Sequence, residues 1–295
     1  MNSDQTTRMA TLSGAMAILL WSSLALMTVF TAALPPFQVL AISFAVGGIT
    51  SMFAGSHAVG RLRGMQQPWP GFVLSVAALY GYHALYFIAF RNAPAVEVNL
   101  VNYLWPLLIV VFAAFLPAVR PQPAQFAGTA LGLAGVGIML GHDRGFSFDS
   151  SYWVGYLAAL GAALTWSTYS VLNRRFRDVP SSAIGGACLT VALLAGITHL
   201  TFESTISPTA GQWLVLILMG LGPVGIAFRL WDRGTKHGEI AVLGTLSYAA
   251  PLLSTLLLLL SGAVSAHWSQ AVAVILLMIG AWISVRTQGS RPPTR

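Results

Sequence analysis

The sequence predicts an all-α membrane protein with ten transmembrane helices, built from two inverted five-helix repeats around a central cavity. Three observations predict this fold. Hydrophobic residues occupy 56% of the 295 positions and charged residues only 8%, whereas soluble domains carry about 25% charged residues. The apolar residues are grouped into segments long enough to cross a bilayer. Finally, residues of the first half recur in the second half at one constant offset.

Ten apolar segments approach the length of about 20 residues that a helix needs to cross the hydrocarbon core of a membrane. They cover residues 9–33, 37–55, 69–90, 94–116, 124–141, 152–173, 182–201, 211–230, 240–262 and 268–285. The connections are short and contain proline, glycine, serine or charge. Because the first segment is longer than the about 7–15 apolar residues of a cleaved signal sequence, we interpret it as a membrane span.

The basic residues predict the orientation of the helices, because short cytoplasmic connections retain lysine and arginine. With ten spans, both termini lie on one side of the membrane, and 13 of the 15 basic residues fall on that side. These are Arg8, Arg61, Arg63, Arg120, Arg174, Arg175, Arg177, Arg229, Arg233, Lys236, Arg286, Arg291 and Arg295. Only Arg91 and Arg144 fall on the other side. We therefore expect cytoplasmic termini, and topology rather than nucleic-acid binding explains the net charge of +7.

Several matches between the two halves share an offset of 145 positions. The matching residues are Trp21-Ser22 with Trp166-Ser167, Pro35 with Pro180, Tyr103 with Tyr248, Pro106-Leu107-Leu108 with Pro251-Leu252-Leu253, and Gly135 with Gly280. Each half has five spans, an odd number, so the second half enters the membrane from the opposite side. Inverted repeats of this kind recur in secondary transporters, whose substrate sites lie near the midplane at the repeat interface.

The ten segments, the tryptophan-serine pairs and the prolines of the fourth and ninth segments resemble the drug/metabolite transporter superfamily, of the type with two EamA domains. The resemblance covers residues 12–285 and agrees with two domains, 9–141 and 152–285. It implies a bacterial inner-membrane protein in which helices one to four and six to nine surround a cavity, with helices five and ten as outer support. The first half is most similar to bacterial aromatic amino acid exporters.

One face of the third segment carries polar aromatic side chains. Tyr82, His83 and Tyr86 are separated by helical steps that place them together with Leu79 and Phe90. Packing between helices explains such residues singly. A histidine inside a membrane span is costly, however, unless it faces the bundle interior or water. We expect this face to line the cavity.

The fourth segment carries a second polar stripe. Asn99, Asn102 and Tyr103 share one helical face, and Trp105 lies on an adjacent face. The asparagines can bond to neighbouring helices, an effect of about 0.6 kcal/mol in membranes, or accept hydrogen bonds from a substrate ammonium group. Tyr248 is the second-half counterpart of Tyr103, and the second half is otherwise smaller at the equivalent positions.

A proline interrupts the fourth segment and another interrupts the ninth. Pro106 and Pro251 cannot donate to the carbonyls four residues back, which belong to Asn102 and Ser247. Such carbonyls are tolerated in hydrocarbon only where protein or a wet cavity satisfies them. We predict that both prolines are hinges beside the binding site.

The sixth segment contains a tryptophan well away from the membrane interfaces, where this residue usually lies. Trp166 is followed on the same helix by Tyr169 and Asn173, a more polar set than the neighbours of Trp21 in the first segment. Core packing and cavity lining explain an internal tryptophan about equally. We place Trp166 and Tyr169 in the binding site.

The sequence contains no pattern that indicates catalysis, a cofactor or a metal site. A phosphate-binding loop of the Walker type is absent, and the six histidines lack zinc-ligand spacing. Glu97 is the only acid placed within a span, and the first segment has none. This disfavours the cation/proton exchange of the related small multidrug exporters.

These features predict a secondary transporter that exports small zwitterionic metabolites, with aromatic amino acids as the substrates that the resemblance implies. Its partners are the substrate and the lipid bilayer, and one chain containing both halves can act as a monomer. The alternatives are a broader drug/metabolite exporter, a sugar-nucleotide carrier and a membrane scaffold without transport activity. A sugar-nucleotide carrier needs cationic groups near the diphosphate, and the predicted cavity segments contain none.

Overall fold

A computed structural model describes residues 3–53, 67–116, 119, 121–141, 149–262 and 265–286. Among these residues every regular element is a helix. Some basic residues used above to predict orientation lie outside the described residues: Arg61, Arg63, Arg120, Arg144, Arg291 and Arg295.

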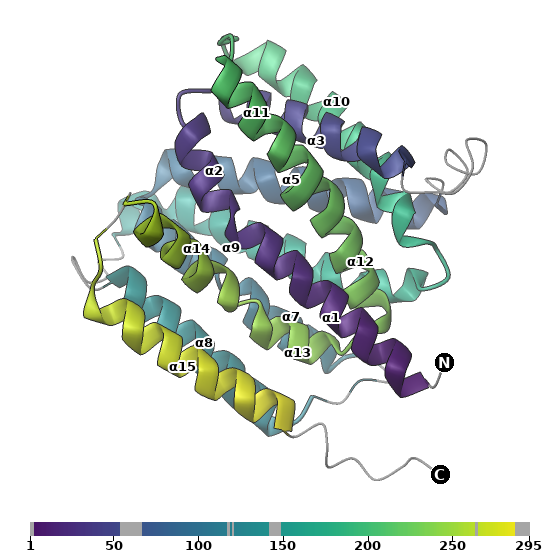
Figure 1. Cartoon of the computed structure of the whole chain (residues 1–295), viewed down its shortest axis with the longest axis vertical. Coiled ribbons are helices and arrows are strands. Elements are labelled where there is room, and N and C mark those ends of the chain that lie inside the picture. The colour runs from purple at the N-terminus through teal and green to yellow at the C-terminus, as the bar shows by residue number, and fades with distance from the viewer. Residues whose placement is uncertain are drawn as a thin grey trace. The chain divides into compact units, whose positions relative to one another are not determined.

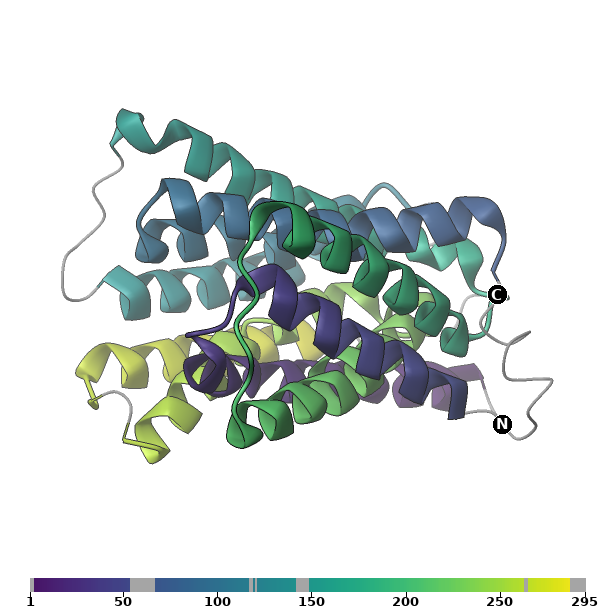
Figure 2. The same ribbon diagram turned by 90° about the horizontal axis from the view of Figure 1, so that it is seen from above.

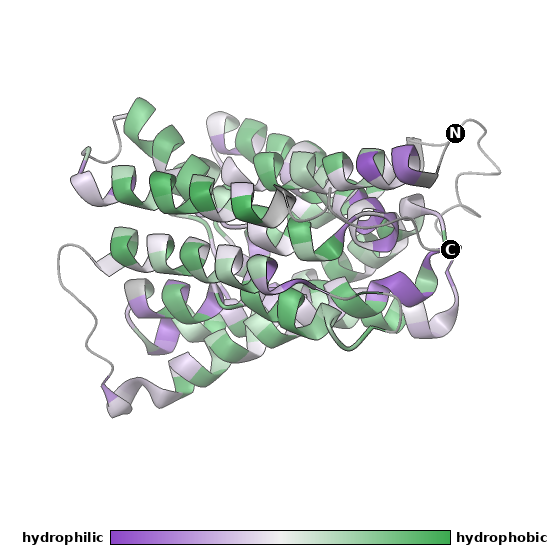
Figure 3. Ribbon diagram, turned by 90° about the horizontal axis from the view of Figure 1, so that it is seen from below, coloured by the Kyte–Doolittle hydropathy of each residue, from purple (hydrophilic) through white to green (hydrophobic). Residues whose placement is uncertain are grey.

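Six of the described helical stretches are long and apolar enough to cross a membrane. They are Asp4–Thr31, Trp69–Asn92, Pro123–Gly141, Ser181–Phe202, Ala210–His237 and Ile240–Leu260, and shorter apolar helices cover Pro36–Ser51, Glu97–Ala113 and Trp268–Ile283. Figure 3 shows apolar residues along most of the helices, with hydrophilic stretches mainly close to helix ends. This distribution suits a bilayer, where the middle of each helix meets hydrocarbon.

The helices form two compact units, and each unit takes helices from both halves of the sequence. Unit 1 comprises Met1–His83 and Leu172–Gly238, and unit 2 comprises Ala84–Val171 and Glu239–Arg295. Each unit is described separately below.

Unit 1 is built around two antiparallel helix pairs, in which α1 packs against α12 and α3 against α10. Its elements are α1 (Ser3–Ser22), α2 (Leu24–Thr31), α3 (Pro36–Phe53), the first part of α5 (Trp69–Asn92), η2 (Asn173–Phe176), η3 (Ser181–Ala183), α10 (Ile184–Phe202), α11 (Ala210–Met219), η4 (Gly220–Ile226) and α12 (Ala227–His237). In the first pair, Trp21 contacts Trp231 near one end, and Thr11 adjoins Gly238 near the other.

The predicted end of the eighth segment at residue 230 is wrong, because α12 continues to His237. The additional turns carry Asp232 and Lys236, whose side chains form an ion pair of 2.9 Å and are almost completely buried. Lys236 also donates to the carbonyl of Val179 at 3.0 Å. Charged residues therefore extend the helix because their partners lie within the protein.

A π-helical segment, η4, joins α11 to α12 and contains Pro223. The π-helix accommodates a proline that would otherwise leave a carbonyl unsatisfied. The indole Nε1 of Trp21 donates to the Pro223 carbonyl at 2.9 Å, and the Trp21 ring also packs on Phe228. Gly220 lets this segment approach α3, because a Cβ there would overlap Val46.

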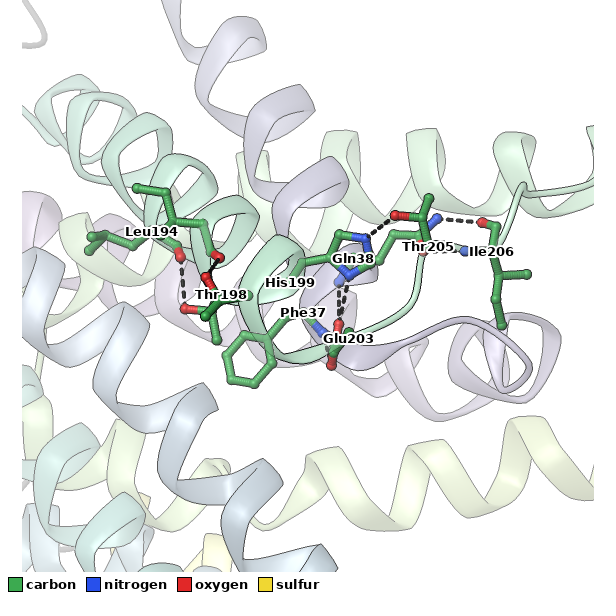
Figure 4. A network of polar contacts seen from close by, with 10 residues as sticks. Phe37, Gln38, Leu194, Thr198, His199, Glu203, Thr205 and Ile206 are labelled. Carbon is green, nitrogen blue, oxygen red and sulfur yellow. Dashed lines mark hydrogen bonds and ion pairs between the residues drawn. The ribbon is translucent and has the colours of Figure 1, made fainter.

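A polar network ties the end of α10 to the start of α3 (Figure 4). The Glu203 carboxylate accepts hydrogen bonds from the backbone N–H groups of Phe37 and Gln38 at 3.2 and 3.3 Å. His199 Nδ1 lies 2.9 Å from Glu203 Oε2. The Gln38 amide donates to the Ile206 carbonyl at 2.6 Å and accepts from its N–H at 3.1 Å. These bonds satisfy the first N–H groups of a helix, where negative charge is favoured.

Unit 2 contains the proline-broken helices and a glycine-mediated contact between two helices. Its elements are the remainder of α5, α6 (Ala95–Asn102), α7 (Trp105–Ala113), α8 (Pro123–Gly141), η1 (Ser150–Tyr152), α9 (Trp153–Leu172), α13 (Ile240–Leu246), α14 (Ala249–Leu260) and α15 (Trp268–Arg286). Helices α8 and α15 lie side by side (Figures 1 and 2). Glycine at their contact allows the backbones to approach closely.

The contact between α8 and α15 is reciprocal. A Cβ on Gly280 would overlap the carbonyl oxygen of Gly128, and a Cβ on Gly135 would lie 3.1 Å from the carbonyl oxygen of Ala273. As the residue number rises along α8 it falls along α15, so the helices are antiparallel. The offset of 145 that relates Gly135 to Gly280 also relates Gly128 to Ala273, so the two contacts are equivalent.

We expect Gly280→Ala to destabilise the protein by about 1–3 kcal/mol, because the added methyl group forces two backbones apart. The measurement is the thermal unfolding temperature of the full chain in detergent. Gly196→Ala is the matched control: Gly196 is also in a helix, and a Cβ there has no atom within 4 Å. Alanine favours helix by up to about 1 kcal/mol over glycine, so the control should not unfold earlier. Equal unfolding temperatures for both variants would contradict this account.

Candidate functional site

Both predicted proline breaks are present in unit 2. Helix α6 ends at Asn102 and α7 begins at Trp105, one residue before Pro106. Helix α13 ends at Leu246 and α14 begins at Ala249, two residues before Pro251. Both helices are interrupted for the same reason, since proline lacks the N–H group that would continue the hydrogen bonds of the α-helix.

The second break satisfies its freed carbonyl within the protein. We expected protein or a wet cavity to satisfy the carbonyl of Ser247, and it accepts a hydrogen bond from the N–H of Ala250 at 3.1 Å. A tighter turn, with a bond over three residues instead of four, uses this carbonyl locally. The Ser247 hydroxyl also donates to the Leu243 carbonyl, at 2.6 Å. The second break therefore offers no free carbonyl of Ser247 to a ligand.

A tyrosine from the second break reaches the first. The hydroxyl of Tyr248 donates to the carbonyl of Tyr103 at 3.0 Å. Tyr248 is fully buried, and Gly132 makes room for it: a Cβ on Gly132 would lie 2.5 Å from the Tyr248 ring. Sequence analysis predicted Tyr248 to be a substrate-binding residue; the structure places its hydroxyl in the packing between helices.

A tyrosine-asparagine pair joins α5 to α6 in unit 2. The Tyr86 hydroxyl donates to Asn99 Oδ1 at 2.7 Å, and both residues are half-buried. The Tyr86 ring packs edge-on against Phe90, with ring centroids 4.6 Å apart. Asn102, the last residue of α6, and Trp105, the first residue of α7, are buried. Two of the predicted substrate-binding residues, Tyr86 and Asn99, are therefore in direct contact.

Trp166 and Tyr169 are neighbours on α9, with ring centroids 5.3 Å apart and an interplanar angle of 38°. Both side chains are buried. The hydroxyls of Ser167 and Ser170 donate to carbonyls of their own helix, at 2.7 and 2.8 Å. Both hydroxyls beside the two buried rings therefore bond within α9 itself.

Tyr82 and His83 belong to unit 1. His83 Nδ1 lies 2.6 Å from the carbonyl of Leu79, and its ring is edge-on to Phe44 and to Tyr82, at centroid separations of 5.4 and 5.2 Å. The other predicted substrate-binding residues are in unit 2: Tyr86, Asn99, Asn102, Tyr103, Trp105, Trp166, Tyr169 and Tyr248.

Asn173, which the sequence analysis grouped with Trp166, belongs to unit 1, whereas Trp166 belongs to unit 2. Its amide nitrogen donates to Asp232 Oδ1 at 2.9 Å and to Thr235 Oγ1 at 3.1 Å within unit 1. The residue holds the end of α12 to the 3-10 segment that follows α9. Sequence reasoning missed this role because the partners are about 60 residues away along the chain.

Sequence reasoning also missed a pocket of about 590 Å³ in unit 1. It contains none of the predicted site residues and is lined by Arg177, Asp178, Val179, Pro180, Ser181, Ile226, Arg229, Leu230, Arg233 and His237. The spacing of Arg229, Arg233 and His237 by four was the available signal. Separately, the described residues contain no group of three or more His, Cys, Asp and Glu side chains that could hold a metal ion.

Apolar helices of membrane-spanning length, broken by prolines and packed through glycines, define a multi-pass membrane protein with a helical fold. Residues 8–141 and 153–286 each match the EamA-like transporter family. The chain belongs to this family, as the resemblance in the sequence predicted.

The relatives that match the chain cover nearly all of it. An aromatic amino acid exporter, YddG, of Ancylobacter novellus is 48% identical over 277 residues, which is 93% of this chain and 96% of the relative. The proteins of the same name from Escherichia coli and Salmonella typhimurium are 26% and 27% identical, over 95% of this chain and 99% of each relative. A solved crystal structure matches with a TM-score of 0.90 and 46% identity, covering 95% of this chain and 98% of that one.

We expect Tyr248→Phe to destabilise the protein by about 1 kcal/mol, because the partly buried Tyr103 carbonyl loses its bond to the Tyr248 hydroxyl. The measurement is thermal unfolding of the full chain in detergent. Tyr152→Phe is the control, since Tyr152 is exposed at a helix start and its hydroxyl forms no hydrogen bond with another described residue. A Tyr248→Phe protein as stable as the control would show that the bond contributes nothing.

Proposed function

We propose that this protein is a secondary transporter of the bacterial inner membrane that exports aromatic amino acids. The observation that carries the proposal is the Tyr86–Asn99 pair, which combines an aromatic ring with an amide beside a proline-broken helix. The names of the relatives support the choice of substrate.

The proposed architecture has ten transmembrane helices in two inverted five-helix repeats, residues 9–141 and 152–285. The family model matches the chain twice, over nearly these ranges. Helices at equivalent positions also run antiparallel within each unit, as α8 and α15 do in unit 2. In unit 1, Phe37 of α3 adjoins Glu203 after α10, and Gly48 adjoins Leu189, so this pair is antiparallel too. Antiparallel equivalents are what an inverted repeat requires.

The repeat offset also suggests a contact that forms the aromatic wall of the site. In unit 1, the rings of Trp21 and Trp231 lie 5.2 Å apart. An offset of 145 places Trp166 at the position equivalent to Trp21, and Tyr86 at the position equivalent to Trp231. Both Tyr86 and Trp166 are in unit 2. We therefore propose that these two rings face one another and bind the flat side chain of the substrate.

The chemistry of the proposed site suits a zwitterion with an aromatic side chain. Stacked or edge-on aromatic contacts contribute roughly 0.5–1.5 kcal/mol each beyond burial of area. The amide oxygens of Asn99 and Asn102 can accept from the ammonium group, and their amide nitrogens can donate to the carboxylate. Glu97 accepts a hydrogen bond from the Tyr156 hydroxyl at 3.3 Å, so this acid has a partner within unit 2.

Transport would proceed by rocking of the two repeats, with Pro106 and Pro251 as the flexible points. A helix that lacks one hydrogen bond bends at lower cost than an intact one. Cytoplasmic termini follow from the distribution of basic residues, and one chain that contains both repeats suffices as a monomer.

The test is counterflow of labelled tryptophan, phenylalanine and threonine into liposomes that contain the purified protein. We expect uptake of the two aromatic amino acids and not of threonine. Trp166→Ala and Tyr86→Phe should raise the half-saturating concentration, by about two- to tenfold for Trp166→Ala. Trp213→Ala is the control, because this tryptophan is partly exposed on α11.

Three results would argue against the proposal. Competition by many unrelated compounds would favour a drug/metabolite exporter of broad specificity. Wild-type activity in both Trp166→Ala and Tyr86→Phe would place the substrate elsewhere. Absence of counterflow in well-folded wild-type protein would remove the transport function itself.

Replacing Pro106 should separate stability from transport. Pro106→Ala restores an N–H group that can continue the helix, so we expect stability to be unchanged or higher. We expect the maximal counterflow rate to fall on the order of tenfold, because the helix loses its flexible point. Pro123→Ala is the control, since Pro123 is the first residue of α8, where a missing N–H is harmless. A Pro106→Ala rate equal to that of the control would exclude a hinge at this residue.

A further inference from the structure

We propose that the basic pocket of unit 1 binds the phosphate headgroup of an anionic membrane lipid. The pocket is lined on one side by a stripe of α12 and the end of η4: Ile226, Arg229, Leu230, Arg233 and His237 follow one another at helical steps. The other side is the connection Arg177–Ser181, which precedes α10. Helix and connection together enclose a concave site.

Three guanidinium groups are available in this pocket. The side chains of Arg177, Arg229 and Arg233 form no hydrogen bond or ion pair with any other residue of the described chain. Asp178 is the one carboxylate among the lining residues. The positive charge of the pocket is therefore not neutralised by the protein, and arginine is the side chain best suited to bidentate binding of phosphate.

Two basic residues that do not line the pocket, Arg174 and Lys236, have partners within the protein. Arg174 Nη1 donates to the carbonyls of Thr235 and Gly238 at 2.9 and 2.8 Å, closing the end of α12. Lys236 is buried in its ion pair with Asp232. These two cations stabilise the fold, whereas the three arginines of the pocket have no such role. The predicted topology accounts for their side of the membrane but not for their gathering around one pocket.

The polarity of the stripe favours a lipid over a soluble anion. Ile226 is 53% exposed and Leu230 is partly exposed. Each of these apolar residues lies three positions before an arginine of the stripe, Ile226 before Arg229 and Leu230 before Arg233. From Ile226 to Arg233 the helix rises about 10 Å, a distance comparable with that from acyl chain to headgroup phosphate. A lipid would place its chain on Ile226 and Leu230 and its phosphate on Arg229 and Arg233. A soluble phosphate would leave the apolar part of the stripe uncovered.

The orientation of basic residues agrees with this assignment. The pocket arginines belong to the set that sequence analysis assigned to the cytoplasmic side, where the leaflet carries anionic lipids and basic residues near its surface bind it. His237, at the end of the stripe, adds a further nitrogen donor when protonated. The ligand class is therefore an anionic phospholipid, with phosphatidylglycerol as a suitable probe.

The experiment measures lipid binding to the full-length protein by native mass spectrometry, together with thermal unfolding in detergent. We expect phosphatidylglycerol to remain bound and to raise the unfolding temperature more than phosphatidylcholine does. Arg229→Gln with Arg233→Gln should weaken phosphatidylglycerol binding by about fivefold or more for each arginine removed. Arg175→Gln is the control, because Arg175 is exposed on η2 and does not line the pocket.

The outcomes separate the possible sources of binding. Inorganic phosphate alone should not stabilise the protein; stabilisation by phosphate equal to that by the lipid would overturn the assignment to a lipid. An equal loss in Arg175→Gln would overturn a defined site and indicate general attraction to charge. If the double variant unfolds, Arg229→Lys with Arg233→Lys keeps the charge and should retain most of the binding. Lipid binding is measured without substrate. A protein that failed to bind phosphatidylglycerol would therefore contradict this lipid site and leave the proposed transport function unaffected.

Discussion

The fold of unit 2 depends on one constraint, which is that a backbone carbonyl left open where a helix is interrupted must find a donor away from water. In hydrocarbon an unsatisfied carbonyl costs several kcal/mol. The Tyr248 hydroxyl reaches the carbonyl of Tyr103, one residue into the first break. The Tyr248 ring needs the space that Gly132 provides, so α8 is placed by the same contact. Three helices are therefore positioned by the chemistry of one break.

In unit 1, too, backbone groups at interrupted or ending helices are satisfied by side chains of the protein. Pro223 disturbs the helix there, and the indole of Trp21 donates to its carbonyl. Elsewhere the helix ends are held by buried charge: Glu203 satisfies the first N–H groups of α3, and the pair of Asp232 and Lys236 carries α12 beyond its apolar part. Helices of a membrane protein can thus keep polar residues provided that the partners are internal. Arg177, Arg229 and Arg233, which pair with no other residue that the structure describes, are therefore the ones we propose to bind another molecule.

The sequence predicted the helical class, the family and the two breaks, because hydropathy and proline act locally. Helical spacing also placed Tyr86 and Asn99 on the polar faces of their own helices, and the contact between them came from the structure. It did not predict the end of α12, where Asp232 and Lys236 look like residues of a loop until their contact is known. The same holds for Asn173, whose partners come from a distant helix. For the carbonyl of Ser247 the sequence left open whether protein or a wet cavity satisfies it, and the N–H of Ala250 does so. Contacts between distant segments are set by packing, which one sequence does not specify.

The bond between Tyr248 and Tyr103 joins a position to its own duplicate, since the two residues occupy the same place in the two halves. Such a bond lies across the axis that would relate the halves, and one partner gives a hydroxyl while the other gives a carbonyl. In a symmetric pair of identical subunits, each subunit would have to offer both the hydroxyl and the carbonyl. A single chain that carries both halves can assign the donor permanently to one copy. The neighbouring residues are then free to diverge, with asparagines retained on one side of the axis and small residues on the other.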